Sequence, residues 1–565
     1  MHKILSLKNK NIFKICLVLV LSLVLSSCNR SISGKSRLTG LTFNEPNSGG
    51  YIRSNSFVKH EVPLGMVTIE GGSFTMGQVQ DDVMFDWNTT PNQLHVRSFF
   101  MDEAEVTNSE YNLYLQYTKD VFPPSEEKYK HVYAAALPDT LVWRKSLGNN
   151  AVLTENYFLH PAFADYPVVG ISWLQANEYC KWRTNIVNLK KLIDKGYIKN
   201  IFASDSTRNF FDSERFLYDS DRLFAEDSTI YKKGVNQKVA RKQGAERPSK
   251  DAFRGRKISK ADGILQTKFR LPTEAEWEFA AKATAGNRDY NMIKGRKKYP
   301  WDEKYTRASD RKNRGNQLAN FKQGKGNYSG ISGWTSDGSA ITIEIKSYPP
   351  NAYGLYDMAG NVAEWVADVY RPMIDSEAND FNYYRGNIFT KKMIDENGKV
   401  VIAGEDIPTV YKTLPNGKIV PEETPGTIKY IPITKTDAVY RRNFSEANNA
   451  NTGDGDLSSS RLYESSPEAF ANNTNMYNSP KEPEIVRNDA GEEVSKLDTK
   501  KRTTLISNET RVYKGGSWAD REFWLDPAQR RYLPEYMATN YIGFRCVADK
   551  LGPMSNNNSR TTRNR

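Results

Sequence analysis

The chain has 565 residues, of which 38% are hydrophobic and 26% are charged, and its formal net charge is +12. This composition is typical of a folded protein, and its basic residues are spread among acids, which argues against nucleic acid as a partner. At about 150 residues a domain the length suggests three or four domains, but the motifs below favour one domain with large insertions.

The N-terminus has the features of a targeting segment. A lysine-rich start precedes the apolar run at 15–25, which has the length of a signal-peptide core and is too short to span a bilayer. The run ends in Leu25-Ser26-Ser27-Cys28, which resembles a bacterial lipobox. We therefore expect a signal peptide at 1–27, a lipid on Cys28 and a flexible tether at 28–62. An ordinary cleaved signal peptide is the alternative.

The residues after Cys28 lack an aspartate at the next position and an acidic cluster. This pattern predicts a lipid anchor in the cell outer membrane with the protein on the periplasmic face. Two other cysteines, Cys180 and Cys546, remain once Cys16 leaves with the signal peptide. An even pair in an oxidising compartment predicts a disulfide between them.

Local signals predict short strands and three helices in chain order. The segments 65–69 and 71–77 predict a hairpin, and 512–518 and 542–545 predict two further strands. Capping boxes predict helices of about ten to fourteen residues after Thr107, Ser172 and Thr273. Two polar stretches, 184–267 and 371–510, read as insertions, and we expect parts of both and the tail at 551–565 to be disordered.

Five blocks carry a resemblance to one family. They lie at 71–77, 166–182, 269–279, 349–365 and 511–546, and two of them read FRLPTEAEWEF and GLYDMAGNVAEW. In this order they resemble the formylglycine-generating enzyme, or sulfatase-modifying factor, family. The resemblance implies an α+β fold, distantly like C-type lectins, with little regular secondary structure. The domain would comprise 63–183, 268–370 and 511–550.

The chemistry of that family depends on two thiols that bind copper, and Cu(I) prefers such soft ligands. This chain has Asp520 and Leu525 at those positions. The resemblance therefore implies a protein without catalytic residues and without copper, which is not an enzyme. It also implies that Cys180 and Cys546 form the family's structural disulfide. The five histidines are not paired at ligand spacing.

The resemblance further implies two structural calcium sites, because hard oxygen ligands in tight loops suit Ca²⁺. The first would use the side chains of Asp357 and Glu364 and the carbonyls of Gly360 and Val362. The second would use Asn320, the carbonyl of Phe321, Asp337 and the carbonyl of Ser339. The alternative is that these side chains only cap turns.

Within the superfamily, the segments 81–84 and 137–143, the lipobox and the two insertions resemble the gliding-motility lipoproteins of Bacteroidetes-type bacteria. This implies a non-catalytic scaffold for gliding and type IX secretion. Its partners would be other gliding and secretion proteins, including the ring lipoprotein K and its periplasmic partner.

Two other functions stay open. A divergent enzyme could use Asp520 with Ser517 and Arg521, although Asp520 could equally form a surface ion pair with a nearby arginine. A carbohydrate- or peptidoglycan-binding module could stack sugars on Trp518, Trp524 and Tyr532, although aromatic residues at this density more often form a core.

Overall fold

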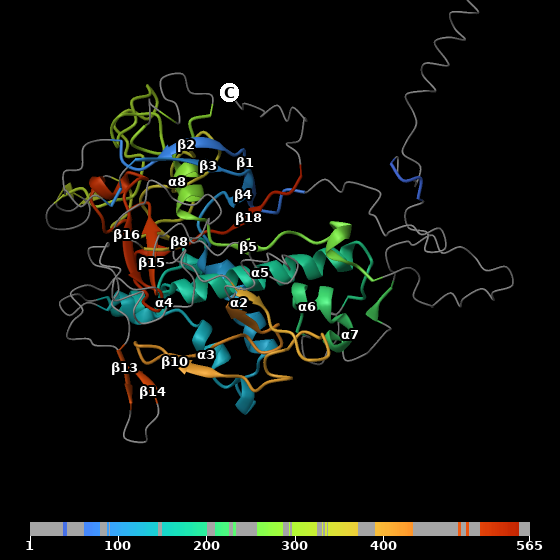
Figure 1. Cartoon of the computed structure of the whole chain (residues 1–565). Helices are drawn as coiled ribbons and strands as arrows, with labels where there is room; N and C mark the ends of the chain where they lie inside the picture. The colour runs from blue at the N-terminus through green and yellow to red at the C-terminus, as the bar shows by residue number, and fades with distance from the viewer. Residues whose placement is uncertain are drawn as a thin grey trace, which may run out of the picture. The chain divides into compact units, whose positions relative to one another are not determined.

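The computed structural model divides the chain into two compact units. The larger is His60–Lys191, Asn200–Glu226 and Gln266–Arg565, and the smaller is Met1–Lys59, Leu192–Lys199 and Asp227–Leu265 (Figure 1). The structure describes residues 38–41, 61–79, 88–89, 91–144, 150–200, 210–224, 230–232, 257–285, 293, 297–324, 330–331, 334–335, 337–370, 390–432, 484–487, 493–496 and 509–552. The predicted signal peptide, Cys28, almost all of the tether and almost all of the tail lie outside these ranges. None of the described helices has both the length and the apolar content to span a membrane.

Three capping boxes begin helices where the sequence predicts them. They precede α2 (Asn108–Val121), α5 (Trp173–Asp194) and α8 (Glu274–Lys282). At the first box the Thr107 side chain accepts from the Glu110 amide, and the Glu110 carboxylate accepts from the Thr107 amide. This arrangement satisfies amides that no helical carbonyl can reach.

Helix α5 is longer than predicted, with 22 residues. Its second half crosses the predicted boundary at 183 and carries polar side chains that bind the core backbone. Thr184 Oγ1 accepts from the Phe269 amide at 2.9 Å, and Asn188 Oδ1 accepts from the Gln266 amide at 2.7 Å. The first residues of the predicted insertion are therefore an integral part of the core.

Two four-stranded sheets form the centre of the larger unit. One has the order β1 (Met66–Ile69), β4 (Phe99–Asp102), β18 (Val547–Asp549), β5 (Phe269–Arg270). The other has the order β16 (Arg531–Pro534), β15 (Thr510–Lys514), β8 (Ala363–Val369), β17 (Ile542–Gly543). All pairings are antiparallel except that between β17 and β8. Short helices beside short strands give the predicted α+β class.

The predicted hairpin at 65–77 is wrong. Strand β1 pairs with β4, whereas β2 (Gly72–Met76) pairs with β3 (Asn92–Val96). Between β1 and β2, the Gly71 backbone lies so close to the end of β3 that a Cβ on it would lie 2.2 Å from the Val96 carbonyl oxygen. The backbone changes sheets at this glycine, and the alternation of side chains that predicts a strand does not specify its partner.

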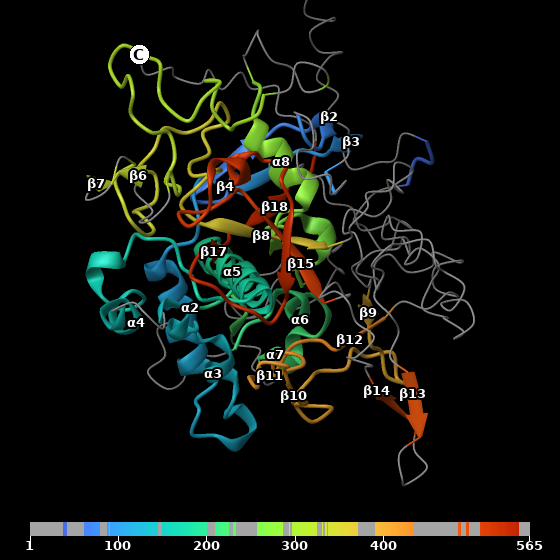
Figure 2. The ribbon, with the colours of Figure 1, turned by 90° about the vertical axis from the view of Figure 1, so that its left-hand side faces the viewer.

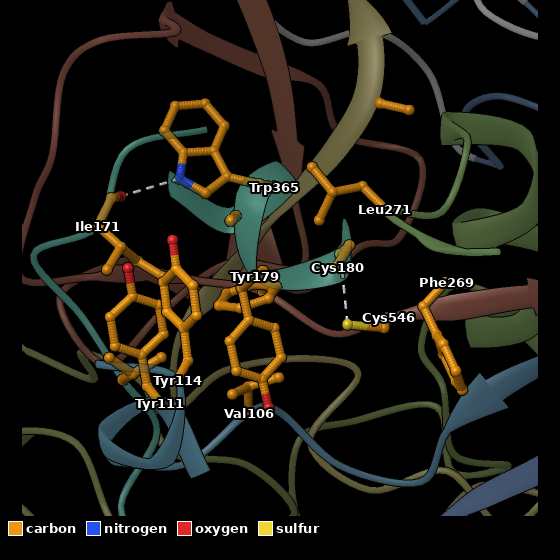
Figure 3. Packing of buried hydrophobic residues seen from close by; sticks show 14 of the residues in the cluster. Val106, Tyr111, Tyr114, Ile171, Tyr179, Cys180, Phe269, Leu271, Trp365 and Cys546 are labelled. Atoms are coloured by element: carbon orange, nitrogen blue, oxygen red, sulfur yellow. Dashed lines mark hydrogen bonds between the residues drawn. The ribbon is translucent and has the colours of Figure 1, made fainter. Parts of the chain in front are cut away.

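The main core is built from aromatic residues on both faces of β8. All seven residues of β8 are buried, as in a strand that is covered on two sides. Figure 3 shows Trp365 of this strand donating from Nε1 to the Ile171 carbonyl, at 3.2 Å, above the rings of Tyr111, Tyr114 and Tyr179. Tyr111 and Tyr179 stack with ring centroids 5.6 Å apart, and this packing joins α2 and α5 to the sheet.

The described parts of the two predicted insertions pack on each other. The first supplies α6 (Ser213–Tyr218) and α7 (Ser220–Leu223). The second supplies β9 (Thr390–Lys392) paired with β12 (Tyr430–Pro432), and β10 (Tyr411–Thr413) paired with β11 (Ile419–Pro421). We call residues 210–224 and 390–432 the insertion module; its strand β11 contacts α3 (Val132–Ala136), and the two lie close together in Figure 2.

Ion pairs hold the insertion module together. Buried Arg215 binds both carboxylate oxygens of Glu405, at 2.6 and 2.7 Å, and Arg222 binds both oxygens of Asp406, at 2.8 and 3.0 Å. Among the described residues, the other α-helices and strands of the larger unit are α4 (Ala151–Asn156), β6 (Gly330–Ile331), β7 (Trp334–Thr335), β13 (Glu484–Arg487) and β14 (Glu493–Lys496).

Candidate functional site

The turn after β15 and the short 3-10 helix that follows it (Glu522–Leu525) hold the two positions at which the resemblance implies lost thiols. Gly515 and Gly516 have φ values of 97° and 67°. A Cβ on them would lie 2.9 Å from the Trp277 ring and 2.8 Å from the Trp524 carbonyl oxygen, so the turn requires glycine. The turn brings Ser517 beside Asp520, and the Ser517 hydroxyl donates to Asp520 Oδ2 at 2.5 Å.

Asp520 is held in a closed ion pair. Both its oxygens accept from Arg531, at 2.6 and 2.7 Å. The Arg531 guanidinium lies over the rings of Tyr513 and Trp524, 4.7 Å from each centroid. Each oxygen of the Asp520 carboxylate is thus already hydrogen-bonded, and the guanidinium compensates its charge.

The other lost-thiol position is apolar. Leu525 is fully buried and packs with Tyr299, Phe321 and Ala359. The structure therefore brings Ser517 and Asp520 together, as the divergent-enzyme alternative requires. However, Asp520 pairs with Arg531, and Arg521 is exposed.

The aromatic residues proposed as a sugar platform do not form one. Trp518 is 2% exposed, stacks on Trp143 at 5.9 Å and donates from Nε1 to the Asn540 carbonyl. Tyr532 stacks on Tyr370 at 4.2 Å. Two of the three rings are thus used for packing within the protein.

The loop 357–364, which leads into β8, contains three residues in the left-handed backbone conformation. Asp357 and Asn361 have φ values of 54° and 56°, and Gly360 has 83°. A Cβ on Gly360 would lie 2.4 Å from the Asn320 carbonyl oxygen. Non-glycine residues adopt this conformation at a cost in free energy, and such strain is concentrated at functional sites.

Buried carboxylate oxygens gather at this loop. Asp357 Oδ2 accepts from the Lys346 amide at 2.8 Å, whereas Asp357 Oδ1 is buried with no hydrogen-bond partner. Glu105 Oε1, on the segment before α2, is also buried without a partner. Burial, reinforced by the charge of Asp357, raises the pKa of Glu105 well above its ordinary range, and burial raises the pKa of Asp357 to about 6. A cation would relieve both desolvation and repulsion here.

The sequence reasoning missed Glu105. A signal was present, since this glutamate stands between Ala104 and Val106, which are both buried, two residues before a helix cap. A charged residue inside such an apolar segment indicates a paired or ligating group.

Glu364 has a different role from the other predicted ligands. Its Oε1 accepts from Arg545 at 2.6 Å, and its Oε2 accepts from Arg545 at 2.7 Å and from Trp277 Nε1 at 2.8 Å. The described structure thus uses Glu364 as the partner of a buried arginine. Both of its oxygens are hydrogen-bonded within the protein, and a calcium-binding role for the Glu364 side chain stays a prediction.

In the second predicted calcium site, the segments that carry Phe321 and Asp337 are in direct contact. Asp337 Oδ2 accepts from the Phe321 amide at 3.2 Å, and Asp337 Oδ1 is buried without a partner. Burial raises the pKa of Asp337. Asn320 donates from Nδ2 to the Ile341 carbonyl, and the Ser339 hydroxyl donates to the Thr342 carbonyl, which fixes the loop around Asp337.

The chemistry of these loops fits a hard cation. Unpartnered carboxylate oxygens and nearby loop carbonyls, including those predicted for Gly360 and Val362, are the donors that Ca²⁺ prefers. No three carboxylate, thiol or imidazole side chains converge as a ligand set in the part of the chain that the structure describes. Each site would therefore depend on backbone carbonyls, and calcium stays a prediction.

The two loops brace the turn at 515–520. The Gly360 amide donates to the Gly515 carbonyl, and the Trp518 amide donates to the Asn361 carbonyl, both at 2.9 Å. From the second site, the Lys322 amide donates to the Asp520 carbonyl at 2.8 Å. Two separate parts of the sequence, residues 360–361 and Lys322, thus fix the turn that carries Asp520.

The cysteines expected to form a disulfide lie side by side in the core. Their sulfur atoms are 3.4 Å apart (Figure 3). Both are buried, and burial raises the pKa of the Cys546 thiol well above its ordinary range. The structure supports the choice of partners, and the covalent bond stays a prediction.

Comparisons with known proteins agree with this architecture. The model of the family described as "Sulfatase-modifying factor enzyme 1-like domain" matches residues 55–403. The formylglycine-generating enzyme of Mus musculus is 23% identical over 318 residues, covering 54% of this chain and 58% of that protein. The serine/threonine-protein kinase pkn1 of Chlamydia pneumoniae is 24% identical over 338 residues, covering 59% of this chain and 32% of that protein. The chain thus spans less than two thirds of these relatives.

Two further similarities extend the comparison. The inactive C-alpha-formylglycine-generating enzyme 2 of Mus musculus is 39% identical over 104 residues, covering 18% of this chain and 27% of that protein. The solved structure of PvdO from Pseudomonas aeruginosa aligns with 86% of this chain and 94% of that one, at 14% identity and a TM-score of 0.34. The family match covers more than half of the sequence, and the chain therefore belongs to the sulfatase-modifying factor enzyme 1-like domain family.

Proposed function

We propose that this chain is a non-catalytic member of its family that works as a scaffold. In this proposal it is a lipoprotein of the outer membrane, anchored through Cys28, and it supports gliding motility and type IX secretion. It resembles gliding lipoprotein J, a paralogue of gliding lipoprotein K. Its partners are lipoprotein K and the periplasmic partner of K.

The proposal that the chain is not a catalyst rests on the surroundings of Asp520 and Leu525. Where the resemblance implies two copper-binding thiols, one side chain is locked to Arg531 and the other is buried among apolar groups. Neither group supplies a soft ligand or a free nucleophile. One of the relatives is itself named as inactive.

The insertion module supports the scaffold part. It is ordered, it is fixed to the core, and it adds surface that the family's core motifs do not supply. Tyr411 donates from its hydroxyl to the Lys128 carbonyl at 2.6 Å, and Asn416 donates to the Tyr536 carbonyl at 2.9 Å. Loops on a rigid framework are common binding surfaces.

A copper experiment tests the first part. The purified full chain is titrated with Cu(I) and incubated with a cysteine-containing substrate peptide, beside an active formylglycine-generating enzyme. We expect no stoichiometric copper uptake and no oxidised peptide. The double variant Asp520→Cys with Leu525→Cys serves as the matched control, because it restores a thiol at each of the two positions. Copper binding and peptide oxidation by the natural chain would overturn the proposal.

A membrane pull-down tests the second part. The tagged full chain is isolated beside a variant in which a short glycine-serine linker replaces residues 391–431. The linker can close because Thr390 and Pro432 are paired across β9 and β12. We expect the natural chain to co-isolate lipoprotein K and its periplasmic partner, and the variant to lose them while keeping its near-UV circular dichroism. Equal recovery by both proteins would contradict a role for the module.

A further inference from the structure

A rigid loop carries a concentration of exposed positive charge outside the regions discussed so far. We call residues 304–316 the basic loop. All of its cations are at exposed positions: Arg307 binds the loop's own backbone, and the four others are Lys304, Arg311, Lys312 and Arg314. Asp310 is its one acidic residue. In Figure 2 this segment, coloured yellow-green, extends away from α8 at the upper left. Among the described residues no carboxylate lies within 4.0 Å of any of the four cations.

The backbone of the basic loop is fixed by its own hydrogen bonds. The Ala308 amide donates to the Asn316 carbonyl at 2.8 Å, and the Gly315 amide donates back to the Ala308 carbonyl at 2.9 Å. The Leu318 amide donates to the Thr306 carbonyl at 2.9 Å. A loop that is already ordered loses little conformational entropy when it binds.

Asp310 and Arg307 serve the loop itself. Asp310 Oδ2 accepts from the Lys312 and Asn313 amides, at 3.2 and 3.0 Å, and from Asn313 Nδ2 at 3.1 Å. Arg307 donates from Nη1 to the Gly315 carbonyl at 2.6 Å. The Asp310 carboxylate thus stabilises the turn by accepting hydrogen bonds within it. The charged groups of Arg311, Lys312 and Arg314 are exposed to solvent.

We propose that the basic loop is a docking surface for an acidic segment of a partner protein. Two guanidinium groups can bind carboxylates in the bidentate manner that lysine cannot match. Beside them Tyr305 is 75% exposed, and tyrosine and arginine are enriched at protein interfaces. The inference rests on the scaffold role and names the chemistry of one partner.

The test uses the full chain and a fluorescent peptide of ten glutamates. The triple variant Arg311→Glu, Lys312→Glu, Arg314→Glu should bind the peptide at least about tenfold more weakly, because each substitution replaces an attraction to the peptide's carboxylates with a repulsion. The control variant Lys119→Glu, Lys399→Glu, Lys412→Glu has the same net charge, changes exposed residues elsewhere, and should bind as the natural chain does. An equal loss in both variants would mean non-specific attraction and would overturn the proposal.

A second variant separates loop geometry from charge. Asp310→Ala removes an acidic group and makes the tip more positive, but it also removes three hydrogen bonds from the turn. The proposal expects weaker peptide binding, whereas charge attraction alone would give stronger binding. Loop-dependent binding to vesicles of anionic lipid, with no binding to the peptide, would assign the loop to a membrane and overturn the proposal. These assays need neither gliding nor secretion, so their failure is distinguishable from failure of the scaffold role.

Discussion

The core and the insertion module both use arginine–carboxylate pairs, but in different surroundings. In the core, Arg545 and Glu364 are 0% and 1% exposed, and they connect β8 with the segment between β17 and β18. In the module, Arg222 and Asp406 are 32% and 34% exposed. A buried charge that loses its partner is very costly, whereas an exposed pair contributes little. The same chemical contact should therefore be essential in one region and dispensable in the other.

The largest contrast should come from deleting one arginine in each region. Arg545→Met leaves the Glu364 carboxylate buried without its partner and should lower the free energy of unfolding by about 3–5 kcal/mol. Arg222→Met should lower it by no more than about 1 kcal/mol. Urea unfolding of both variants measures the difference, and equal losses would show that burial does not separate the two regions.

Two glycines with the same backbone conformation provide a second comparison. Gly360 in the core loop and Gly417 in the β10–β11 turn have φ values of 83° and 84°. A Cβ on Gly360 would meet the Asn320 carbonyl oxygen at 2.4 Å, whereas a Cβ on Gly417 would meet nothing within 4 Å. Gly360→Ala should cost about 3 kcal/mol through strain and overlap, and Gly417→Ala about 1 kcal/mol through strain alone. Thermal unfolding of the two variants would test whether the extra cost comes from the close approach.

The pH dependence of stability should test whether Asp357, in the loop 357–364, is protonated more readily in the folded state than in the unfolded state. Burial raises the pKa of Asp357 to about 6 from 3.8, so the folded state binds its proton more tightly than the unfolded state. The calcium-free protein should therefore lose stability as pH rises from about 4 to 6, by up to about 2 kcal/mol from this group. Asp357→Asn removes this contribution and should be less sensitive over the same range.

Calcium provides the counterpart to that measurement. If the loop binds the ion, calcium at pH 7 should stabilise the natural chain and should stabilise Asp357→Asn much less, in calorimetry with and without a chelator. Identical responses of the two proteins to calcium would remove Asp357 from the ligand set.

The smallest global effect should come from releasing the module. Arg215→Met removes the bidentate contact with Glu405 and the bond to the Gly426 carbonyl. We expect about 1–2 kcal/mol of local destabilisation, seen as faster proteolysis within 390–432. The unfolding midpoint of the core should change little. If the variant showed faster proteolysis of the module together with a lower unfolding midpoint of the core, the module and the core would unfold as one unit.

Local chemistry allowed much of the fold to be predicted. The three helix starts follow from capping boxes, because side chains and amides within four residues define them. The partners of β1 and β2 did not follow, since they depend on the close approach at Gly71, and the length of α5 depends on how Thr184 and Asn188 bind distant backbone.

The candidate site shows the same limit. The resemblance named Asp357 and Asp337, and both are buried with an unpartnered oxygen. It could not reveal that Glu364 is occupied by Arg545 and Trp277, or that Glu105 lies beside Asp357. Those facts depend on contacts between segments that are far apart in the sequence.

The position of β18 has a consequence for biosynthesis. This strand, at Val547–Asp549, lies between β4 and β5, so one central sheet cannot close until nearly the whole described chain is available. A nascent chain should therefore stay open during synthesis, because the strand that completes this sheet is among the last described segments to be made. Products cut short before this strand should be unable to mature, and proteases would be expected to remove them.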